Sequence, residues 1–189
     1  MVFVAPYNDL KVVAGQGTIG IELSRQIDYA DAVFICVGGG GLISGIAGYL
    51  KPIWQKVEVV GSSPANSAAM IESIRCGRIV EIETKRTLSD GSAGGSIVPG
   101  SITFELCRSI VDRLETVSEE EIRDRLRTFI ETHHLLIEGS AAVPVATLLR
   151  SGKEYQGKKI TVSSKSLDYL TCGMGTLVPS CLRVTVQKK

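Results

Sequence analysis

Four consecutive glycines at residues 38–41 are the part of this sequence whose residue type and spacing point most directly to chemistry. They follow an apolar run, residues 32–37, with the length and β-branched content of a buried strand. They precede a helical pattern that begins at Leu42. Glycines allow several N–H groups to point at one spot, and a helix start adds free N–H groups and a positive dipole end. The pattern predicts a phosphate-binding loop, although a glycine run can also be only a tight strand-to-helix turn.

The glycines do not match the common nucleotide fingerprints. A dinucleotide site requires G-x-G-x-x-G, and Ile43 or Ser44 stands where the third glycine belongs. The acid that binds the ribose should end the next strand, but residues 57–61 carry their acid, Glu58, inside the run. A Walker loop requires Gly-Lys-Ser/Thr, and no lysine follows the glycines before Lys51. A nucleotide-binding α/β domain is therefore kept only as an alternative.

Four motifs follow one another in the order found in the threonine/serine dehydratases and serine racemases. They are VAGQGTI at residues 13–19, the strand that runs into VGGGGL at 37–42, SDG at 89–91 and LIEGSAA at 136–142. Over about residues 2–163 the chain resembles this family of pyridoxal-phosphate enzymes, which have the tryptophan-synthase-β fold type. Among its members, the chain looks most like the threonine dehydratase-like enzymes, including those of hydroxyectoine breakdown.

The resemblance implies a set of cofactor-binding positions. In that family a serine contacts the pyridine nitrogen, and the matching residue is Ser163, although Ser164 and Lys165 replace the glycines that follow it there. The family's tetraglycine loop donates backbone N–H groups to the phosphate of pyridoxal phosphate, and the matching positions are Gly38, Gly39, Gly40, Gly41 and Leu42.

The resemblance also implies an activity. Pyridoxal phosphate acts as an electron sink for a carbanion. The expected reaction is that of an ammonia-lyase (dehydratase), which converts threonine, serine or a related hydroxy amino acid into a 2-oxo acid and ammonia. The expected partner is thus a small-molecule amino-acid substrate. Racemisation instead of elimination stays open.

Two further acids have two interpretations each. Glu138 matches a family glutamate that sits near the cofactor, but an acid is also favoured at the start of a helix, here residues 139–142. Asp90 and Gly91 match a family loop contact, but they also suit a simple type I turn.

Two features of the family are missing. Its Schiff-base lysine lies in a Ser-x-Lys-x-Arg-Gly segment, which this chain lacks; Lys85 and Arg86 are typical of a solvated charged loop. Covalent catalysis needs that amine, so we assign no catalytic residue and expect the isolated chain to be inactive. Racemase-like relatives also bind a divalent cation through acids, and Ser63 and Ala69 occupy those positions here. Hard cations need charged oxygen ligands, so we predict no metal.

The ends of the chain suggest a fragment. The sequence opens directly on a strand-like run at residues 2–4, as if it were the later part of a longer enzyme. We expect a partial pyridoxal-phosphate domain over 1–168 and a divergent tail over 169–189, in which Leu182, Val184 and Val186 alternate as in a short strand. An alternative is a non-catalytic binding fragment whose open strand edge at 2–4 a partner covers.

The composition of the chain argues against several other classes of function. The chain has 189 residues, 44% of them hydrophobic, and a net charge of +1, which suits one globular domain without nucleic-acid or anionic-membrane partners. No apolar stretch is long enough to cross a bilayer. Five cysteines without zinc spacing or a signal peptide predict reduced thiols and a cytoplasmic location, with Cys36 as a buried hydrophobe. We expect a homo-oligomer or a chain that needs the missing domain.

The order of elements predicts the fold class. Helical patterns are expected at residues 17–29, 42–54 and 101–114, and a capping box at Ser118 opens another, with a helix-end role for His133 and His134. Alternation with the strand-like runs predicts an α/β fold, a mostly parallel sheet with helices on both faces. This is the larger-domain portion of the fold type II pyridoxal-phosphate fold, with the glycine loop at the carboxyl end of a strand.

Overall fold

One five-stranded sheet organises the computed structural model, which describes residues 3–134, 136–163 and 181–185. The strand order in this part of the chain is β3-β2-β1-β4-β5. Four strands are parallel, and β5 runs antiparallel to β4. The prediction of a mostly parallel α/β sheet is confirmed. The strands are β1 (Ala32–Cys36), β2 (Glu58–Pro64), β3 (Arg113–Val117), β4 (Lys159–Ser163) and β5 (Cys181–Thr185).

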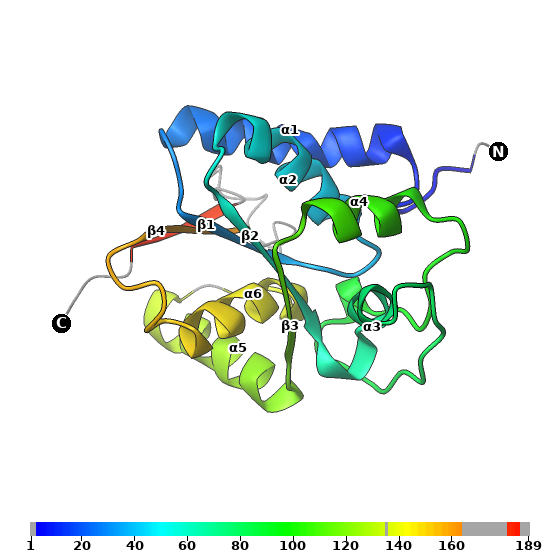
Figure 1. Ribbon diagram of the computed structural model, residues 1–189. Helices are drawn as coiled ribbons and strands as arrows, with labels where there is room; N and C mark the ends of the chain where they lie inside the picture. The colour runs from blue at the N-terminus through cyan, green and yellow to red at the C-terminus, as the bar shows by residue number, and fades with distance from the viewer. Residues whose placement is uncertain (1–2, 135, 164–180, 186–189) are drawn as a thin grey trace.

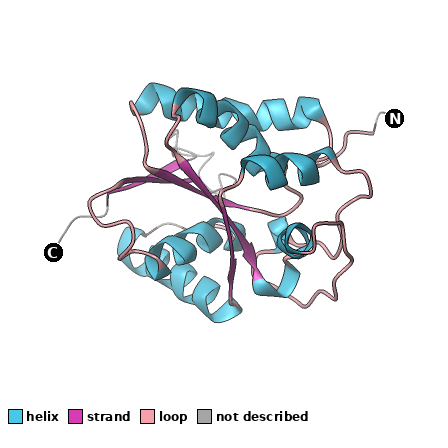
Figure 2. Cartoon of the chain, viewed as in Figure 1, coloured by secondary structure: helices cyan, strands magenta, loops and turns pink. Residues whose placement is uncertain are grey.

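Helices cover both faces of the sheet (Figure 1). One face carries α1 (Leu10–Gln26), α2 (Gly41–Ile53) and α4 (Ile102–Ile110), and the other carries α5 (Glu119–His133) and α6 (Gly139–Arg150). Figure 2 shows these two helical layers with the sheet between them. The short α3 (Ala69–Arg75) and the 3-10 turns η1 (Ala65–Ser67) and η2 (Asp90–Ser92) complete the described elements. No helix in the described ranges is long and apolar enough to span a membrane.

The pleat of β1 divides the core into two halves. Val33 and Ile35 are fully buried among residues of α1, α2 and α4, while Phe34 is fully buried among residues of α5 and α6. Phe34 also meets the ring of Tyr155 edge-on, with 5.1 Å between ring centroids. Because β1 is buried on both faces, its sequence is a continuous apolar run instead of an alternating one.

The first helix begins earlier than its hydrophobic pattern indicates. The prediction was residues 17–29, whereas α1 starts at Leu10, where the Asp9 carboxylate accepts a hydrogen bond from Lys11 N at 2.7 Å. Glycines in its first turns weaken the helical pattern but let α1 and α2 approach closely. A Cβ on Gly17 would lie 3.2 Å from the Gly45 carbonyl oxygen.

Two other expectations about elements were wrong. The helix expected at 101–114 ends at Ile110, and the chain then forms β3, which pairs with β2. Residues 3–5 form no strand, so the open edge expected there does not exist in the described part; Phe3 and Val4 are instead exposed coil residues. The strand expected in the tail is present as β5, although Val186 and most of 169–189 lie outside the described residues.

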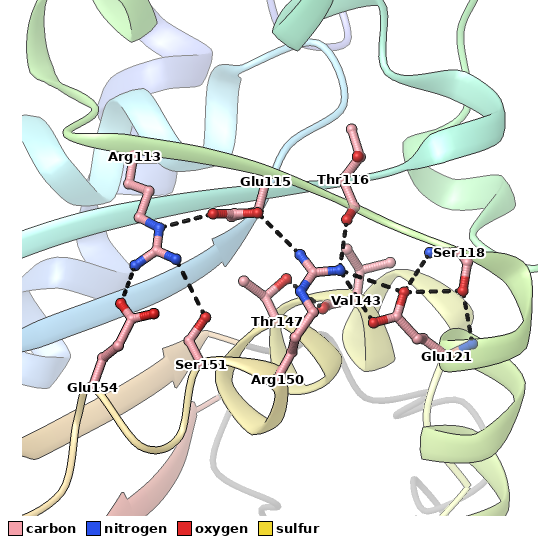
Figure 3. A network of polar contacts seen from close by, with 10 residues as sticks. All are labelled: Arg113, Glu115, Thr116, Ser118, Glu121, Val143, Thr147, Arg150, Ser151 and Glu154. Atoms are coloured by element: carbon pink, nitrogen blue, oxygen red, sulfur yellow. Dashed lines mark hydrogen bonds and ion pairs between the residues drawn. The ribbon is translucent and has the colours of Figure 1, made fainter.

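The edge of the sheet at β3 is tied to α5 and α6 by a network of charges (Figure 3). Arg150 joins Glu115 on β3 at 3.0 Å and Glu121 on α5 at 3.1 Å. The capping box expected at Ser118 is confirmed, since its hydroxyl accepts from Glu121 N while the Glu121 carboxylate accepts from Ser118 N. Although burial opposes ionisation, these bonds from Ser118 and the charge of Arg150 lower the pKa of Glu121.

Candidate cofactor site

A cavity of about 380 Å³ opens at the carboxyl ends of β1 and β4, the usual place for a ligand in such sheets. All six predicted cofactor-binding positions line it: Gly38, Gly39, Gly40, Gly41, Leu42 and Ser163. The structure thus brings together residues that lie more than a hundred positions apart in the sequence. Further lining residues come from the segment at Pro6 and Tyr7, from residues 91–94, 96 and 97, and from the start of α6.

The glycine loop offers a group of free hydrogen-bond donors. Among the described residues, no acceptor is found for the backbone N–H groups of residues 38–42. The loop leads directly into α2, whose first N–H groups have no partners inside the helix. Gly40 and Gly41 are buried, and buried donors without acceptors are rare in folded proteins, so these N–H groups are available to a ligand.

The carbonyl groups of the same loop are held by hydrogen bonds. Ser63 Oγ donates to the Val37 carbonyl at 2.6 Å, and Thr103 Oγ1 donates to the Gly39 carbonyl at 2.7 Å. The Gly40 carbonyl accepts from Ser44 N at 3.1 Å. In a trans peptide the carbonyl and the following N–H point in opposite directions. The N–H groups of residues 38, 40 and 41 therefore point away from these partners.

Side chains at the glycine positions would collide with their neighbours. A Cβ on Gly38 would lie 2.9 Å from the Ser92 carbonyl oxygen, and a Cβ on Gly39 would overlap the ring of Tyr7. Gly40 has a φ of +86°, a left-handed conformation that strains other residues, and a Cβ there would lie 2.8 Å from Cys107 Sγ. The loop needs glycine at these positions for its shape, which a simple strand-to-helix turn would not require at each of them.

Ser163 ends β4, the strand that pairs with β1, and lines the cavity. It is 4% exposed, and its hydroxyl makes no hydrogen bond with any described residue. A buried hydroxyl without a partner is available to a ligand atom. Ser164 and Lys165, which replace the family's glycines, lie outside the described residues.

Glu138 is the one charged residue among the described residues that line the cavity. It occupies the N-cap position of α6, and its Oε2 accepts a hydrogen bond from Ser140 Oγ at 2.9 Å. Both interpretations of this residue thus hold for its position, since it lies at a helix start and also faces the cavity. Gly91 lies beside it, because a Cβ on Gly91 would be 3.2 Å from Glu138 Oε2. Asp90 and Gly91 are the central residues of a turn that Ser92 N closes on the Ser89 carbonyl at 3.1 Å, and this turn is part of η2.

Several lining residues were not expected from the sequence. Tyr7 and Gln16 come from the region of α1, and Ser92 comes from η2. Cys36 was expected to be a buried hydrophobe; it is 8% exposed, yet it also lines the cavity. Burial raises the pKa of the Cys36 thiol to about 11, so at neutral pH the group is a thiol and not a nucleophilic thiolate. Of these residues, only Gln16 lies in one of the family motifs that could have indicated it, VAGQGTI at residues 13–19.

The positions considered for a metal have other roles. The Ser63 hydroxyl is committed to the Val37 carbonyl, and Ala69 is an apolar residue of the cavity wall. No group of three or more His, Cys, Asp or Glu residues within the described ranges is arranged to hold a metal ion. Glu58, which was considered for a nucleotide ribose, lies at the start of β2 and accepts a hydrogen bond from Tyr155 at 2.9 Å.

Comparison with known proteins decides the family. Residues 1–164 match the family described as "Pyridoxal-phosphate dependent enzyme". The chain belongs to this family. The cofactor of the family is pyridoxal phosphate, and the matched range includes the glycine loop, Glu138 and Ser163.

The relatives of this pyridoxal-phosphate family member are amino-acid enzymes. It is 42% identical over 161 residues to the L-threonine ammonia-lyase of Thermotoga maritima. The aligned residues cover 85% of this chain and 39% of that enzyme. Threonine deaminase isoform 2 from Solanum lycopersicum matches with a TM-score of 0.81 and 29% identity, over 94% of this chain and 53% of that one. Serine racemase from Dictyostelium discoideum matches with a TM-score of 0.75 and 30% identity, over 86% and 52% of the two chains. The chain thus spans about half the length of these relatives or less.

Proposed function

We propose that this chain is the cofactor-binding part of a pyridoxal-phosphate-dependent ammonia-lyase that acts on threonine, serine or a related hydroxy amino acid. One observation carries the proposal: the free N–H groups of residues 38–42 line a cavity in a chain of the pyridoxal-phosphate family. The names of its relatives, a threonine ammonia-lyase and a threonine deaminase among them, support the reaction class.

The residues of the cavity suit the parts of the cofactor. The N–H groups of residues 38–42 bind the phosphate, which they can do without a cationic side chain because of the dipole of α2. Ser163, whose hydroxyl makes no hydrogen bond with any described residue, offers that hydroxyl to the pyridine nitrogen. When bound, pyridoxal phosphate supplies an electron sink for the carbanion formed at the amino acid's α-carbon.

Glu138 supplies the cavity with its one carboxylate within the described residues. Its Oε2 is engaged by the Ser140 hydroxyl, and that bond fixes the side chain while Oε1 has no hydrogen-bonding partner among the described residues. We propose that Glu138 holds a proton or accepts a hydrogen bond at Oε1 beside the bound cofactor. Cys36, as a protonated thiol, contributes shape and a weak donor to the same wall.

We further propose that the chain does not turn over substrate by itself. The described residues that line the cavity include no lysine, and the covalent link to the cofactor needs an amine. Lys165 follows β4 in the sequence but lies outside the described residues, so it is the position to examine.

The direct test is a titration of the purified chain with pyridoxal phosphate, followed by borohydride reduction, intact mass and peptide mapping. We expect saturable binding and no adduct at a single lysine, with no 2-oxo acid released from threonine or serine. A one-to-one adduct on one lysine, with turnover, would refute the proposal of an inactive chain. Absence of saturable binding would refute the proposal of a cofactor site.

We propose that a second copy or a missing domain completes the enzyme, because exposed Phe3 and Val4 lie beside the cavity wall formed by Pro6 and Tyr7. A clean monomer in analytical ultracentrifugation would contradict the second copy. The free thiols of Cys36, Cys76 and Cys107 support a reducing, cytoplasmic compartment.

A further inference from the structure

The Gly39 carbonyl is held by a side chain that no part of the proposed function has used. Thr103, at the start of α4, is fully buried, and its Oγ1 donates to the Gly39 carbonyl oxygen at 2.7 Å. The two residues are 64 positions apart in the sequence. Thr103 also packs against the loop, since a Cβ on Gly40 would lie 3.2 Å from Thr103 Cβ. Thr103 therefore fixes the Gly39 peptide by a hydrogen bond and by shape.

A second hydroxyl fixes the direction of that bond. Ser101 Oγ lies 2.8 Å from Thr103 Oγ1, and Ser101 is the N-cap of α4. The Thr103 hydroxyl has a single hydrogen, and the Gly39 carbonyl can only accept, so that hydrogen points to Gly39. Ser101 must then be the donor to Thr103. The contact of Ser101 with Asn8 Oδ1 is longer, at 3.3 Å, and Asn8 Oδ1 already accepts from Ile102 N at 2.8 Å.

The consequence for the glycine loop follows from peptide geometry. With the Gly39 carbonyl drawn toward Thr103, the Gly40 N–H points the opposite way. This N–H has no acceptor among the described residues, as expected for a donor reserved for a ligand. Without the Thr103 hydroxyl, a buried carbonyl would lose its partner, and the peptide could rotate to recover one.

We propose that Thr103, oriented by Ser101, is a positioning residue that aims the Gly40 N–H at the cofactor phosphate. The proposal rests on the proposed function only in taking the phosphate as the ligand of the loop. Thr103 reaches the bound group through the backbone of Gly39 and Gly40, and it makes no contact with the group itself.

The test uses two variants of Thr103 and one matched control. Thr103→Val keeps the shape and removes the donor, whereas Thr103→Ser keeps the donor and removes the methyl group. The control is Thr147→Val: Thr147 is also fully buried, but its Oγ1 donates to Val143 O within α6 at 3.2 Å, away from the loop. All are made in the full 189-residue chain.

The first measurement needs no ligand. In NMR spectra of the free protein, we expect Thr103→Val to shift the Gly39 carbonyl carbon and the Gly40 amide, Thr103→Ser to restore both, and Thr147→Val to leave both unchanged. Unchanged Gly39 and Gly40 resonances in Thr103→Val would overturn the proposal.

The second measurement compares two probes that differ only in the phosphate, pyridoxal phosphate and pyridoxal. We expect Thr103→Val to weaken binding of the first about tenfold, the value of one hydrogen bond, and to leave the second unchanged. We expect Thr103→Ser to stay within about twofold of the parent chain. Equal weakening of both probes, or the same loss in Thr147→Val, would overturn the positioning role. If the parent chain binds neither probe, the proposed function fails, and the Gly39 and Gly40 resonances alone decide the role of Thr103.

Discussion

The glycine loop and the charged edge at β3 use polar groups in opposite ways. At the edge, Arg113 and Arg150 find their partners inside the chain (Figure 3), with Arg113 joining Glu154 at 2.6 Å and Glu115 at 2.8 Å. At the loop, the carbonyls are held by neighbours, while the N–H groups of residues 38–42 have no acceptor among the described residues.

Whether polar groups are already paired distinguishes the structural region from the candidate binding region better than the number of charged side chains does. The charged edge looks chemically rich, yet its ion pairs are already made, and the paired carboxylates raise the pKa of Arg113. The loop carries no charged side chain, yet its N–H groups have no acceptor among the described residues. The paired groups at the β3 edge contribute to the stability of the sheet, whereas the N–H groups of the loop are available to a ligand.

The largest effect should come from Gly39→Ala. The new Cβ would overlap the Tyr7 ring, so either the loop or the wall of the cavity must move. We expect a loss of about 1–3 kcal/mol in stability and a roughly hundredfold weaker binding of pyridoxal phosphate. Thermal melts and a fluorescence titration measure the two effects.

Gly48→Ala is the matched control for that change. Gly48 lies in α2, a few residues after the loop, and a Cβ there would meet nothing within 4 Å. Because alanine is the better helix former, we expect a gain of about 0.5–1 kcal/mol and unchanged cofactor binding. Equal cofactor loss in both variants would mean that the loop has no special need for glycine.

A smaller effect, confined to stability, should come from Arg150→Met at the charged edge. This change removes bonds to Glu115, to Glu121 and to the Thr116 carbonyl at 3.0 Å. Since the Arg150 side chain is 40% exposed, water compensates in part, and we expect a loss of about 1–2 kcal/mol with unchanged affinity for pyridoxal phosphate. Urea unfolding and the same titration measure both.

Arg127→Met provides the comparison for an isolated pair. Arg127 joins Glu131 one turn away on α5, and both side chains are mostly exposed. Because solvent screens this pair, we expect little or no measurable loss of stability. If Arg150→Met lowered the free energy of unfolding no more than Arg127→Met does, the network at β3 would contribute no more stability than an isolated surface ion pair. If it weakened cofactor binding, the separation of the two regions would fail.

Local patterns predicted those parts of the molecule whose partners are close in the sequence. The capping box at Ser118 and the strand–glycine–helix order are of this kind, since three to five residues determine each. The strand β3 was missed because Arg113 and Glu115 give it a polar edge whose partners, such as Glu154, lie some forty residues away. An isolated stretch of sequence does not contain that information.

The candidate site divides in the same way. The glycines and Ser163 were predicted from motifs and lie around one cavity, while their contacts with the cofactor stay a prediction. The hydrogen bond from Thr103 to Gly39 and the contact of Tyr7 with the loop were not predicted. Each depends on packing between segments that are distant in the sequence. Residues that bind a ligand can be recognised from their residue type and motif. Residues that position them, such as Thr103, do not belong to a recognisable motif.

Tyr155 extends the comparison to a titrating group at the opposite end of the sheet, where the expected effect lies in the pH dependence of stability. It is buried, it donates to Glu58 Oε2 at 2.9 Å, and burial together with that bond raises the pKa of its phenol from 10.0 to about 12. Folding therefore favours the protonated form, so its contribution to stability is complete below pH 10 and declines as the pH rises toward about 12.

In Tyr155→Phe this decline should be absent. We expect the parent chain to be more stable than the variant by a constant amount up to about pH 10, and the gap to narrow above it, as measured by urea unfolding at several pH values. The two proteins differ only in this hydroxyl, so the difference between them isolates the phenol. A gap that stayed constant through pH 11 would show that neither burial nor the bond to Glu58 raises the pKa of Tyr155, and that the internal pairing seen at the β3 edge does not extend to its hydroxyl.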